Sequence, residues 1–307
     1  MIIEIIMDVV LPIFVLIGLG ALMHRAFQLN LYTLAKINFY YITPAVVFLS
    51  MYESEMSPAL LGSVTLFYVL YVVLLYGVSS IVSWRRKFKP GMKAAFTNSL
   101  ILDNSGNYGL PINQLAFKGD PLATSIQALV MTFQSLVTFT YGVISVQRAK
   151  SGGTLKAALI GFFKMPVPYA LVLGLIFHVF RWPLPEFAAK PLSYIADSMV
   201  SIALLTLGAQ IIQYPLRLDR LDVYISVFLR LLIGPTLGFL LIYALGLKGI
   251  PAQALLIASG MPTGVNSTIL AEEYDNEPEF ASQTVLISTI LNVITVTALI
   301  SLSKFVA

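Results

Sequence analysis

The chain is a succession of long apolar runs, each separated from the next by a short polar or charged segment. A bilayer core needs about 20 apolar residues per helix. Division of the chain at charge clusters and at Pro/Gly breaks predicts ten spans. They cover roughly residues 6–24, 31–52, 59–84, 93–117, 122–147, 155–180, 191–213, 221–246, 251–272 and 279–304. The pattern therefore predicts an all-α polytopic membrane protein.

Two of these spans, the fourth and the ninth, are interrupted by residues that a continuous helix disfavours. The interruptions, at 103–111 and 259–266, are rich in glycine, proline and small polar residues. Inside lipid, each unpaired backbone group costs several kcal/mol unless protein or a water-filled cavity satisfies it. Two broken spans in corresponding places of two halves are the best indication in a sequence of a transporter's binding site.

Several residues recur at one constant separation. Pro12, Gly20 and His24 of the first span are followed 154 residues later by Pro166, Gly174 and His178 of the sixth. The run 109–111 matches 260–262 at an offset of 151. These matches predict two five-helix repeats, residues 1–150 and 151–307. Because five is odd, the second repeat is inverted, and the two broken helices can cross near the midplane with their half-helix N-termini facing one point. Such a point suits a carboxylate.

The composition supports an integral membrane protein without a separate soluble domain. Hydrophobic residues make up 58% of the chain and charged residues 11%, with a mean hydropathy of +0.85. The chain has no cysteine, which excludes disulfides and thiolate metal sites. No GxxxxGK[ST] motif occurs, so ATP hydrolysis by this chain is not expected to drive transport directly. We expect no cofactor and no nucleic-acid partner; the expected partners are the lipid bilayer and a substrate.

The basic residues predict the orientation of the chain. The strongest basic cluster follows the third span. It comprises Arg85, Arg86, Lys87, Lys89 and Lys93. Placing this loop in the cytoplasm gives eleven Lys and Arg inside and five outside, which the positive-inside rule favours. We therefore predict a protein of the cell inner (plasma) membrane with both termini outside the cytoplasm. The acidic segment 272–279 is an exception, but acidic residues count little in this rule.

Asp103 is the most informative single residue. An aspartate within a span costs roughly 2.5–3.5 kcal/mol and indicates a functional site. It is the candidate ion-coupling residue, holding H⁺ or Na⁺ with help from carbonyls freed by the break. The alternative is that it caps a half-helix.

The candidate substrate-binding residues lie in or next to the two breaks. They are Asn107, Asn266, Asn104, Asn113, Gly106, Gly109, Gly264 and Thr263. The amides and the hydroxyl offer hydrogen bonds, and the glycines allow close approach to the backbone. The alternative is that these side chains only satisfy the broken backbone. Pro111 and Pro262 are expected to make the breaks.

Other polar residues within spans have ordinary structural interpretations. Amides such as Gln114, Gln134 and Asn292 are typical of interhelical hydrogen bonds, with substrate contact as the alternative. Asp197 is expected to pair with a basic residue such as Lys36. For Arg230 we expect a side chain that extends to the interface from near a span end, with attraction of an anion as the alternative.

The motifs at the breaks resemble a known family. Residues 104–111 (Asn-Ser-Gly-Asn-Tyr-Gly-Leu-Pro) and 259–262 (Ser-Gly-Met-Pro), with Asn266, resemble the auxin efflux carrier family of bacterial transporters, relatives of plant PIN-type carriers. The resemblance covers all ten spans. It implies a scaffold domain of spans 1, 2, 6 and 7 that also forms a homodimer. It further implies a transport domain of spans 3–5 and 8–10 that moves as an elevator, and organic anions as substrates.

We therefore predict a secondary carrier of a small organic anion, and no enzyme. One alternative is a membrane sensor that binds a ligand without moving it. Another is an intramembrane protease, but aspartyl chemistry needs two carboxylates that share a proton. The Tyr-Asp and Gly-x-Gly-Asp signature of such proteases is absent around Asp103 and Asp197.

Overall fold

The computed structural model describes residues 6–306 except 55, 151–162, 214 and 218. Within these residues every regular element is a helix, and one isolated antiparallel bridge is the only strand-like pairing. The predicted all-α class is confirmed for this part of the chain. Among the described residues, seven helical stretches are long and apolar enough to cross a membrane. They are Met7–Phe27, Leu31–Tyr52, Pro58–Arg85, Pro121–Gln147, Glu186–Ile211, Leu221–Ala244 and Pro278–Ser303.

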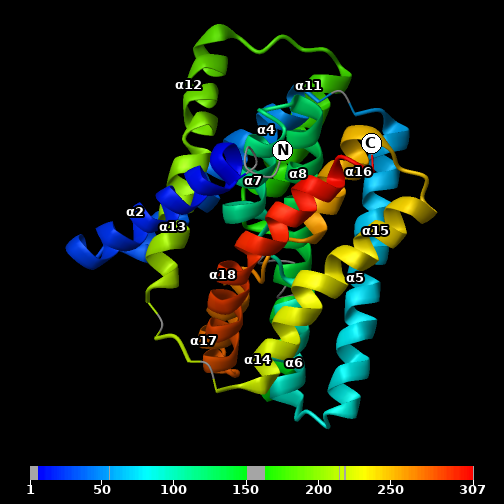
Figure 1. The fold of residues 1–307 in the computed structure, drawn as a ribbon. Coiled ribbons are helices and arrows are strands. Elements are labelled where there is room, and N and C mark those ends of the chain that lie inside the picture. Colours follow the sequence, from blue (N-terminus) through cyan, green and yellow to red (C-terminus); the bar gives the residue numbers. More distant parts are fainter. Residues whose placement is uncertain (1–5, 55, 151–162, 214, 218, 307) are drawn as a thin grey trace.

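The elements, with η for π-helical turns, follow one another along the chain (Figure 1). They are η1 (Ile6–Val10), α2 (Leu11–Phe27), α3 (Leu31–Ile37), η2 (Asn38–Ile42), α4 (Thr43–Tyr52), α5 (Pro58–Arg85), α6 (Pro90–Ile101), η3 (Ser105–Gly109), α7 (Leu110–Ala116), α8 (Pro121–Val137), η4 (Thr138–Gly142), α9 (Val143–Lys150), α11 (Val167–Val179), α12 (Glu186–Asp197), α13 (Met199–Ile211), α14 (Leu221–Phe228), η5 (Leu229–Ile233), α15 (Gly234–Ala244), α16 (Gly249–Ser259), α17 (Val265–Glu273) and α18 (Pro278–Ser303).

The three remaining predicted spans are not single long helices within the described residues. The fourth is divided into α6 and η3–α7, and the ninth into α16 and α17. The sixth is represented by the short apolar helix α11, and its predicted beginning lies in 151–162, outside the described residues. The predicted junction of the two repeats lies at the same place, as does Lys156, one of the predicted cytoplasmic charges.

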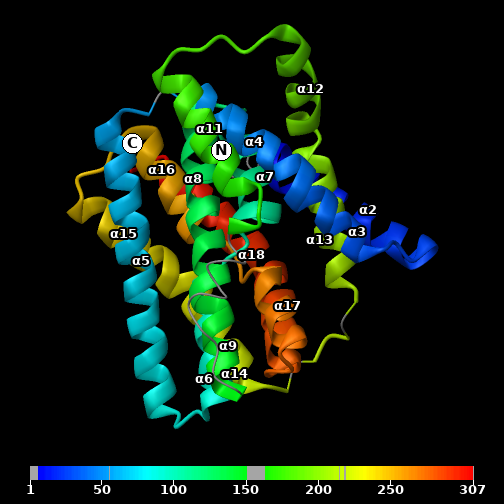
Figure 2. The ribbon, with the colours of Figure 1, turned by 180° about the vertical axis from the view of Figure 1, so that it is seen from behind.

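Buried apolar side chains divide the helices into two groups. The buried members of two clusters come only from α5–α8 and α14–α18, with Phe67, Leu102 and Leu255 in one and Phe96 and Leu231 in the other. We call α5–α9 with α14–α18 the six-span group, and η1–α4 with α11–α13 the four-span group. Three further clusters join residues of both groups. Figures 1 and 2 show α2, α12 and α13 on one flank and α5 and α15 on the other.

Glycines let the helices of the four-span group approach closely. A Cβ atom on Gly20 of α2 would lie 2.1 Å from the carbonyl oxygen of Leu205 of α13, and one on Gly174 of α11 would lie 2.6 Å from that of Phe48 of α4. Small residues at such contacts allow two backbones to pack directly. Gly20 and Gly174, which are 154 residues apart, therefore make the same kind of contact, each with a helix from the other half of the chain.

The α2–α13 contact gives a first prediction. Gly208→Ala should lower the free energy of unfolding by about 1–3 kcal/mol, because its Cβ atom would lie 1.9 Å from the carbonyl oxygen of Ile17. Gly18→Ala, on α2, is the control, since a Cβ atom there meets nothing within 4 Å. Thermal unfolding of the purified variants in detergent measures the difference. Equal midpoints for the two variants would contradict the close approach of these helices.

Candidate functional site

The structure brings the two predicted interruptions together. After α6 and α16 the chain becomes extended, and Asp103 and Thr263 form the isolated antiparallel bridge. The N–H of Asn104 donates to the carbonyl of Pro262 at 2.9 Å, and the N–H of Gly264 donates to that of Leu102 at 2.7 Å. Each break therefore satisfies backbone groups of the other, which a membrane interior requires.

Side chains complete this pairing. The hydroxyl of Thr263 donates to the carbonyl of Ser99 at 2.8 Å, and its N–H donates to the Ser288 hydroxyl at 3.1 Å. The amide of Asn292 donates to the carbonyl of Gly260 at 2.8 Å, which is the interhelical role expected for it. Thr263 is fully buried and holds the crossing together, so the structure does not place it where a ligand could bind.

Two of the candidate glycines face protein atoms. A Cβ atom on Gly264 would lie 2.5 Å from the carbonyl oxygen of Asp103. Glycine is therefore needed for the two broken segments to cross at this distance. A Cβ atom on Gly109 would lie 2.7 Å from the Gln127 amide nitrogen, which donates to the carbonyl of Ser105 at 2.9 Å. Gly109 thus leaves room for a protein side chain.

A small pocket lies beside the crossing. It is lined by Phe39, Thr43, Asp103, Asn104, Gly106, Asn107, Met131, Gln134, Ser135, Gly264, Val265 and Asn266. Its volume is about 30 Å³, room for roughly one or two water molecules. Phe39 and Thr43 belong to the four-span group, so the pocket lies where the two groups meet. Six of the candidate residues line it, from both breaks.

The amides differ in their surroundings. Asn104 lines the pocket, and its side-chain nitrogen is buried with no hydrogen-bond partner within the described residues. A buried donor without a partner is costly, and among the candidate amides that line the pocket Asn104 is the one with such an atom. Asn113 also has two unpartnered side-chain atoms, but it is fully buried in α7 and does not line the pocket. The structure thus separates Asn113 from the other candidate amides.

Sequence reasoning missed several residues of this pocket. Phe39 and Thr43 come from the second span, and Met131 and Ser135 come from the fifth, alongside Gln134. None of these residues interrupts a helix in the way that the two breaks do. In the second apolar run, the local feature that could have indicated a pocket residue is Thr43, which directly precedes Pro44.

The prediction for Arg230 is wrong. Its side chain does not reach the interface but is 0% exposed. The guanidinium Nε donates to the carbonyl of Met261 at 2.7 Å, and Nη1 donates to that of Leu100 at 2.9 Å. Nη2 donates to Asp103 Oδ2 at 3.2 Å and to the carbonyl of Ser259 at 3.4 Å. The side chain points inward because a carboxylate and carbonyls from the ends of two half-helices converge there.

Asp103 is accordingly part of a buried ion pair. Its second carboxylate oxygen accepts from the N–H of Ser105 at 3.1 Å and from the Ser105 hydroxyl. The contact to the N–H two residues ahead is an Asx-turn, which supports the backbone as it leaves the break. Both oxygens of the only acid in the pocket lining are therefore engaged by protein donors, and the charge of Asp103 is balanced by Arg230.

The second intramembrane acid lies elsewhere. Asp197, at the end of α12, is exposed and accepts a hydrogen bond from Ser193 at 3.4 Å. The expected pair with Lys36 is not found, since that ammonium lies over the ring of Tyr32, 4.2 Å from its centroid. Asp103 and Asp197 therefore have separate partners and form no carboxylate pair of the kind that aspartyl proteases use.

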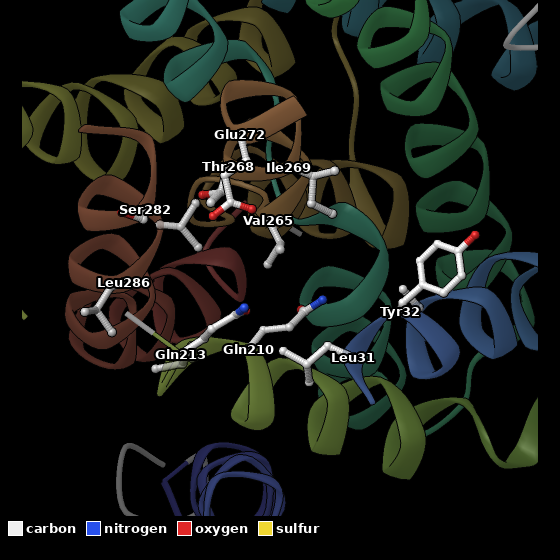
Figure 3. Close-up of a pocket in the computed structure, with 13 residues that line it drawn as sticks. Leu31, Tyr32, Gln210, Gln213, Val265, Thr268, Ile269, Glu272, Ser282 and Leu286 are labelled. Atoms are coloured by element: carbon white, nitrogen blue, oxygen red, sulfur yellow. The ribbon is translucent and has the colours of Figure 1, made fainter. Parts of the chain in front are cut away.

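Two larger recesses also lie between the four-span and six-span groups. One, of about 270 Å³, lies between α3, α13, α17 and α18. Figure 3 shows the amides of Gln210 and Gln213 reaching into it, opposite Val265 and Thr268. Val265 also lines the small pocket, so the two spaces are neighbours. The other, of about 470 Å³, includes residues of α4, α7, α8 and α12.

Nearly the whole chain matches a known protein family. Residues 5–300 match the family described as membrane transport protein. The chain belongs to this auxin efflux carrier family. The segments that carry the resemblance, 104–111 and 259–262, are those that meet at the crossing. As a member of the family, the protein is a membrane transporter.

Relatives of this auxin efflux carrier family member are named as transporters or auxin efflux carriers. An uncharacterized transporter of Methanothermobacter thermautotrophicus is 25% identical over 296 residues, or 94% of this chain and 95% of the relative. A Rhizobium meliloti protein named "Putative malonate transporter" is 28% identical over 214 residues, 66% of this chain and 64% of the relative. Auxin efflux carrier component 8 of Arabidopsis thaliana is 26% identical over 157 residues, covering 48% and 43% respectively.

Proposed function

We propose that this transporter is a secondary active carrier of a small organic anion, of which one carboxylate group binds in the pocket beside the crossing and the rest lies in the neighbouring recess of about 270 Å³. The observation that carries the proposal is the lining of this pocket. Amides from both breaks face it, and its single acid, Asp103, is neutralised by Arg230. An anion entering the pocket therefore meets hydrogen-bond donors and no unbalanced negative charge.

The backbone favours an anion in the same place. Helix α17 begins at Val265, with Gly264 as its N-cap, and η3 begins at Ser105. The first N–H groups of a helix have no intrahelical acceptor, and they carry partial positive charge. Gly264, Val265 and Gly106 all line the pocket. The malonate named for the Rhizobium relative is a carboxylate, which agrees with this chemistry.

The amides provide the test of the proposal. Asn107→Ala and Asn266→Ala should weaken carboxylate binding by roughly 10-fold to 100-fold, the loss of about 1–3 kcal/mol of hydrogen bonding. Asn107→Asp and Asn266→Asp have nearly the same shape and should weaken it further, because each adds a negative charge. Stabilisation of the purified protein by malonate and longer dicarboxylates in a thermal-shift titration measures binding.

Comparison of the alanine and aspartate variants distinguishes an effect of charge on ligand binding from a loss of the folded structure. Asn113→Asp is the control, because it introduces an acid near the first break at a residue that does not line the pocket. Tighter binding of any ligand by Asn107→Asp or Asn266→Asp would show that the pocket takes a cation, and the proposed function would be wrong. Proteoliposomes then report uptake for the ligand that stabilises the protein.

The architecture proposed with this function is a 5+5 inverted repeat of residues 1–150 and 151–307. The equivalent contacts of Gly20 and Gly174 and the pairing of the two broken spans support it. In this proposal the four-span group is the scaffold and the six-span group is the transport domain. Movement of the six-span group as an elevator would expose the pocket in turn through the two recesses at their boundary.

For the orientation we propose an inner (plasma) membrane location with both termini outside the cytoplasm. The α5–α6 and α17–α18 connections lie at one end of the molecule, and both ends of the described chain lie toward the other (Figures 1 and 2). The first of these connections contains the basic cluster at 85–89. Accessibility of single cysteines introduced at Lys87 and Lys304 to an impermeant thiol reagent tests this, with labelling from opposite sides expected.

A homodimer through the scaffold is also proposed. Helix α12 has no buried residue, and Phe187 and Tyr194 are 82% and 73% exposed. Light scattering of the detergent-solubilised protein should give the mass of two chains. Phe187→Arg with Tyr194→Arg should shift it to one, whereas arginine replacements of exposed apolar residues on α15 should not.

A further inference from the structure

The C-terminal ends of two half-helices converge on one side chain. The carbonyls of Leu100 in the last turn of α6, and of Ser259 and Met261 at the end of α16, all accept from Arg230. The last carbonyls of a helix lack intrahelical donors and carry partial negative charge. With the carboxylate of Asp103 they form a buried concentration of negative potential. In carriers with broken helices, such carbonyls and half-helix C-termini coordinate Na⁺ or H⁺.

The surroundings of Arg230 hold its side chain at this point. It belongs to η5, a π-helical turn of the eighth span, a form that is frequent at functional sites. The Tyr71 hydroxyl accepts from Nη1 at 3.2 Å and donates to the carbonyl of Ser259 at 2.7 Å. A Cβ atom on Gly238 would lie 2.4 Å from the Ser259 hydroxyl, so glycine lets α15 pack directly against the end of α16. The guanidinium is enclosed on several sides by its acceptors.

We propose that Arg230 is the resident cation of this crossing, and that its guanidinium fills the position in which a broken-helix carrier binds a coupling cation, so that the protein requires no Na⁺. A guanidinium is always charged and offers several donors in a fixed plane. It satisfies three carbonyls and one carboxylate, and it cannot leave because it is covalently attached. A second cation at this point would be repelled by the first.

Removal of the side chain should convert the position into an open cation site. Arg230→Ala leaves the carboxylate of Asp103 and the three carbonyls facing an empty space. We expect its midpoint of thermal unfolding to fall by roughly 10 °C, since a buried charge is left unpaired. Methylguanidinium at non-denaturing concentration should recover about half of this loss in a saturable way. Na⁺ should recover less of the lost midpoint. Each cation is compared with choline at equal ionic strength.

The controls isolate the position. The wild type should show no saturable response to Na⁺ or methylguanidinium. Arg217→Ala removes an exposed arginine paired with Glu279 at 2.5 Å, and it should likewise show none. Arg230→Ala combined with Asp103→Asn removes the carboxylate and should lose the cation response. If Arg230→Ala cannot be purified, Arg230→Lys takes its place, with a smaller loss of stability and no saturable cation response expected.

Transport gives a second readout, which rests on the proposed function. With malonate as the probe in proteoliposomes, wild-type uptake should be equal in Na⁺ and choline, and Arg230→Ala uptake should depend on added methylguanidinium or Na⁺. Saturable stabilisation of the wild type by Na⁺, or the same cation response in Arg230→Ala and Arg217→Ala, would overturn the inference. Absence of any carboxylate binding would instead overturn the proposed function, and the stability measurements would still decide the role of Arg230.

Discussion

Gly264→Val is expected to abolish substrate transport and to lower the free energy of unfolding by more than about 3 kcal/mol. A Cβ atom at this position would lie 2.5 Å from the carbonyl oxygen of Asp103 and 3.1 Å from that of Leu102. The obstacle is the backbone of residues 102–103, so no rotamer change can relieve it. The N–H of Gly264 also donates to the Leu102 carbonyl, and separation of the two chains would leave that bond unmade inside the membrane protein.

Thermal unfolding in detergent and uptake by proteoliposomes measure the two effects. Gly77→Val is the control, because a Cβ atom at Gly77 on α5 meets nothing within 4 Å; it should change both quantities little. A Gly264→Val variant that unfolds like Gly77→Val would show that the two broken spans do not cross as closely as the backbone bonds require.

The second large effect is expected from the buried ion pair. Arg230→Met should lower the free energy of unfolding by about 3–5 kcal/mol, because it leaves the carboxylate of Asp103 buried without its counter-charge. Asp103→Asn should also destabilise, because it leaves the guanidinium unbalanced. The double variant should be more stable than Arg230→Met alone, since replacing both members of a buried pair costs less than removing one.

A double-mutant cycle over these variants gives the coupling energy directly. Arg86→Met and Asp222→Asn provide a matched cycle at a partly exposed pair whose charged atoms are 3.2 Å apart, where we expect about 0–1 kcal/mol. A coupling at Asp103 and Arg230 no larger than that of the exposed pair would contradict the ion pair as the centre of the crossing.

Much of the fold could be predicted because it follows from local composition. The third and last predicted spans, 59–84 and 279–304, agree closely with α5 (Pro58–Arg85) and α18 (Pro278–Ser303). Hydropathy sets the length of such helices whatever they pack against. The two interruptions were also visible, as runs rich in glycine and proline. The first is shorter than predicted, however, because only residues 102–104 leave the helix, and Pro111 lies within the helical stretch η3–α7 and does not make the break. The eighth span was also predicted as a helix, but nothing in its apolar pattern indicates the π-helical turn that presents Arg230.

The candidate site was only partly predictable. Asn104, Asn107 and Asn266 were singled out because they lie in the breaks, and they do line the pocket. Thr263 and Asn113 lie equally close to the breaks, yet Thr263 is used to hold the crossing and Asn113 is buried away from the pocket. The direction of a side chain from an irregular segment depends on what packs against it, and the sequence does not contain that information in any local form.

The sequence by itself determined that this protein is a helical membrane transporter with two broken spans, because hydropathy and backbone breaking act over a few neighbouring residues. The tertiary structure decided what those breaks do. Arg230 lies 127 residues from Asp103 along the chain, and read alone it was predicted to extend toward the interface. It is buried because one acid and the ends of two half-helices converge on it, and only the folded chain brings those charges to one point.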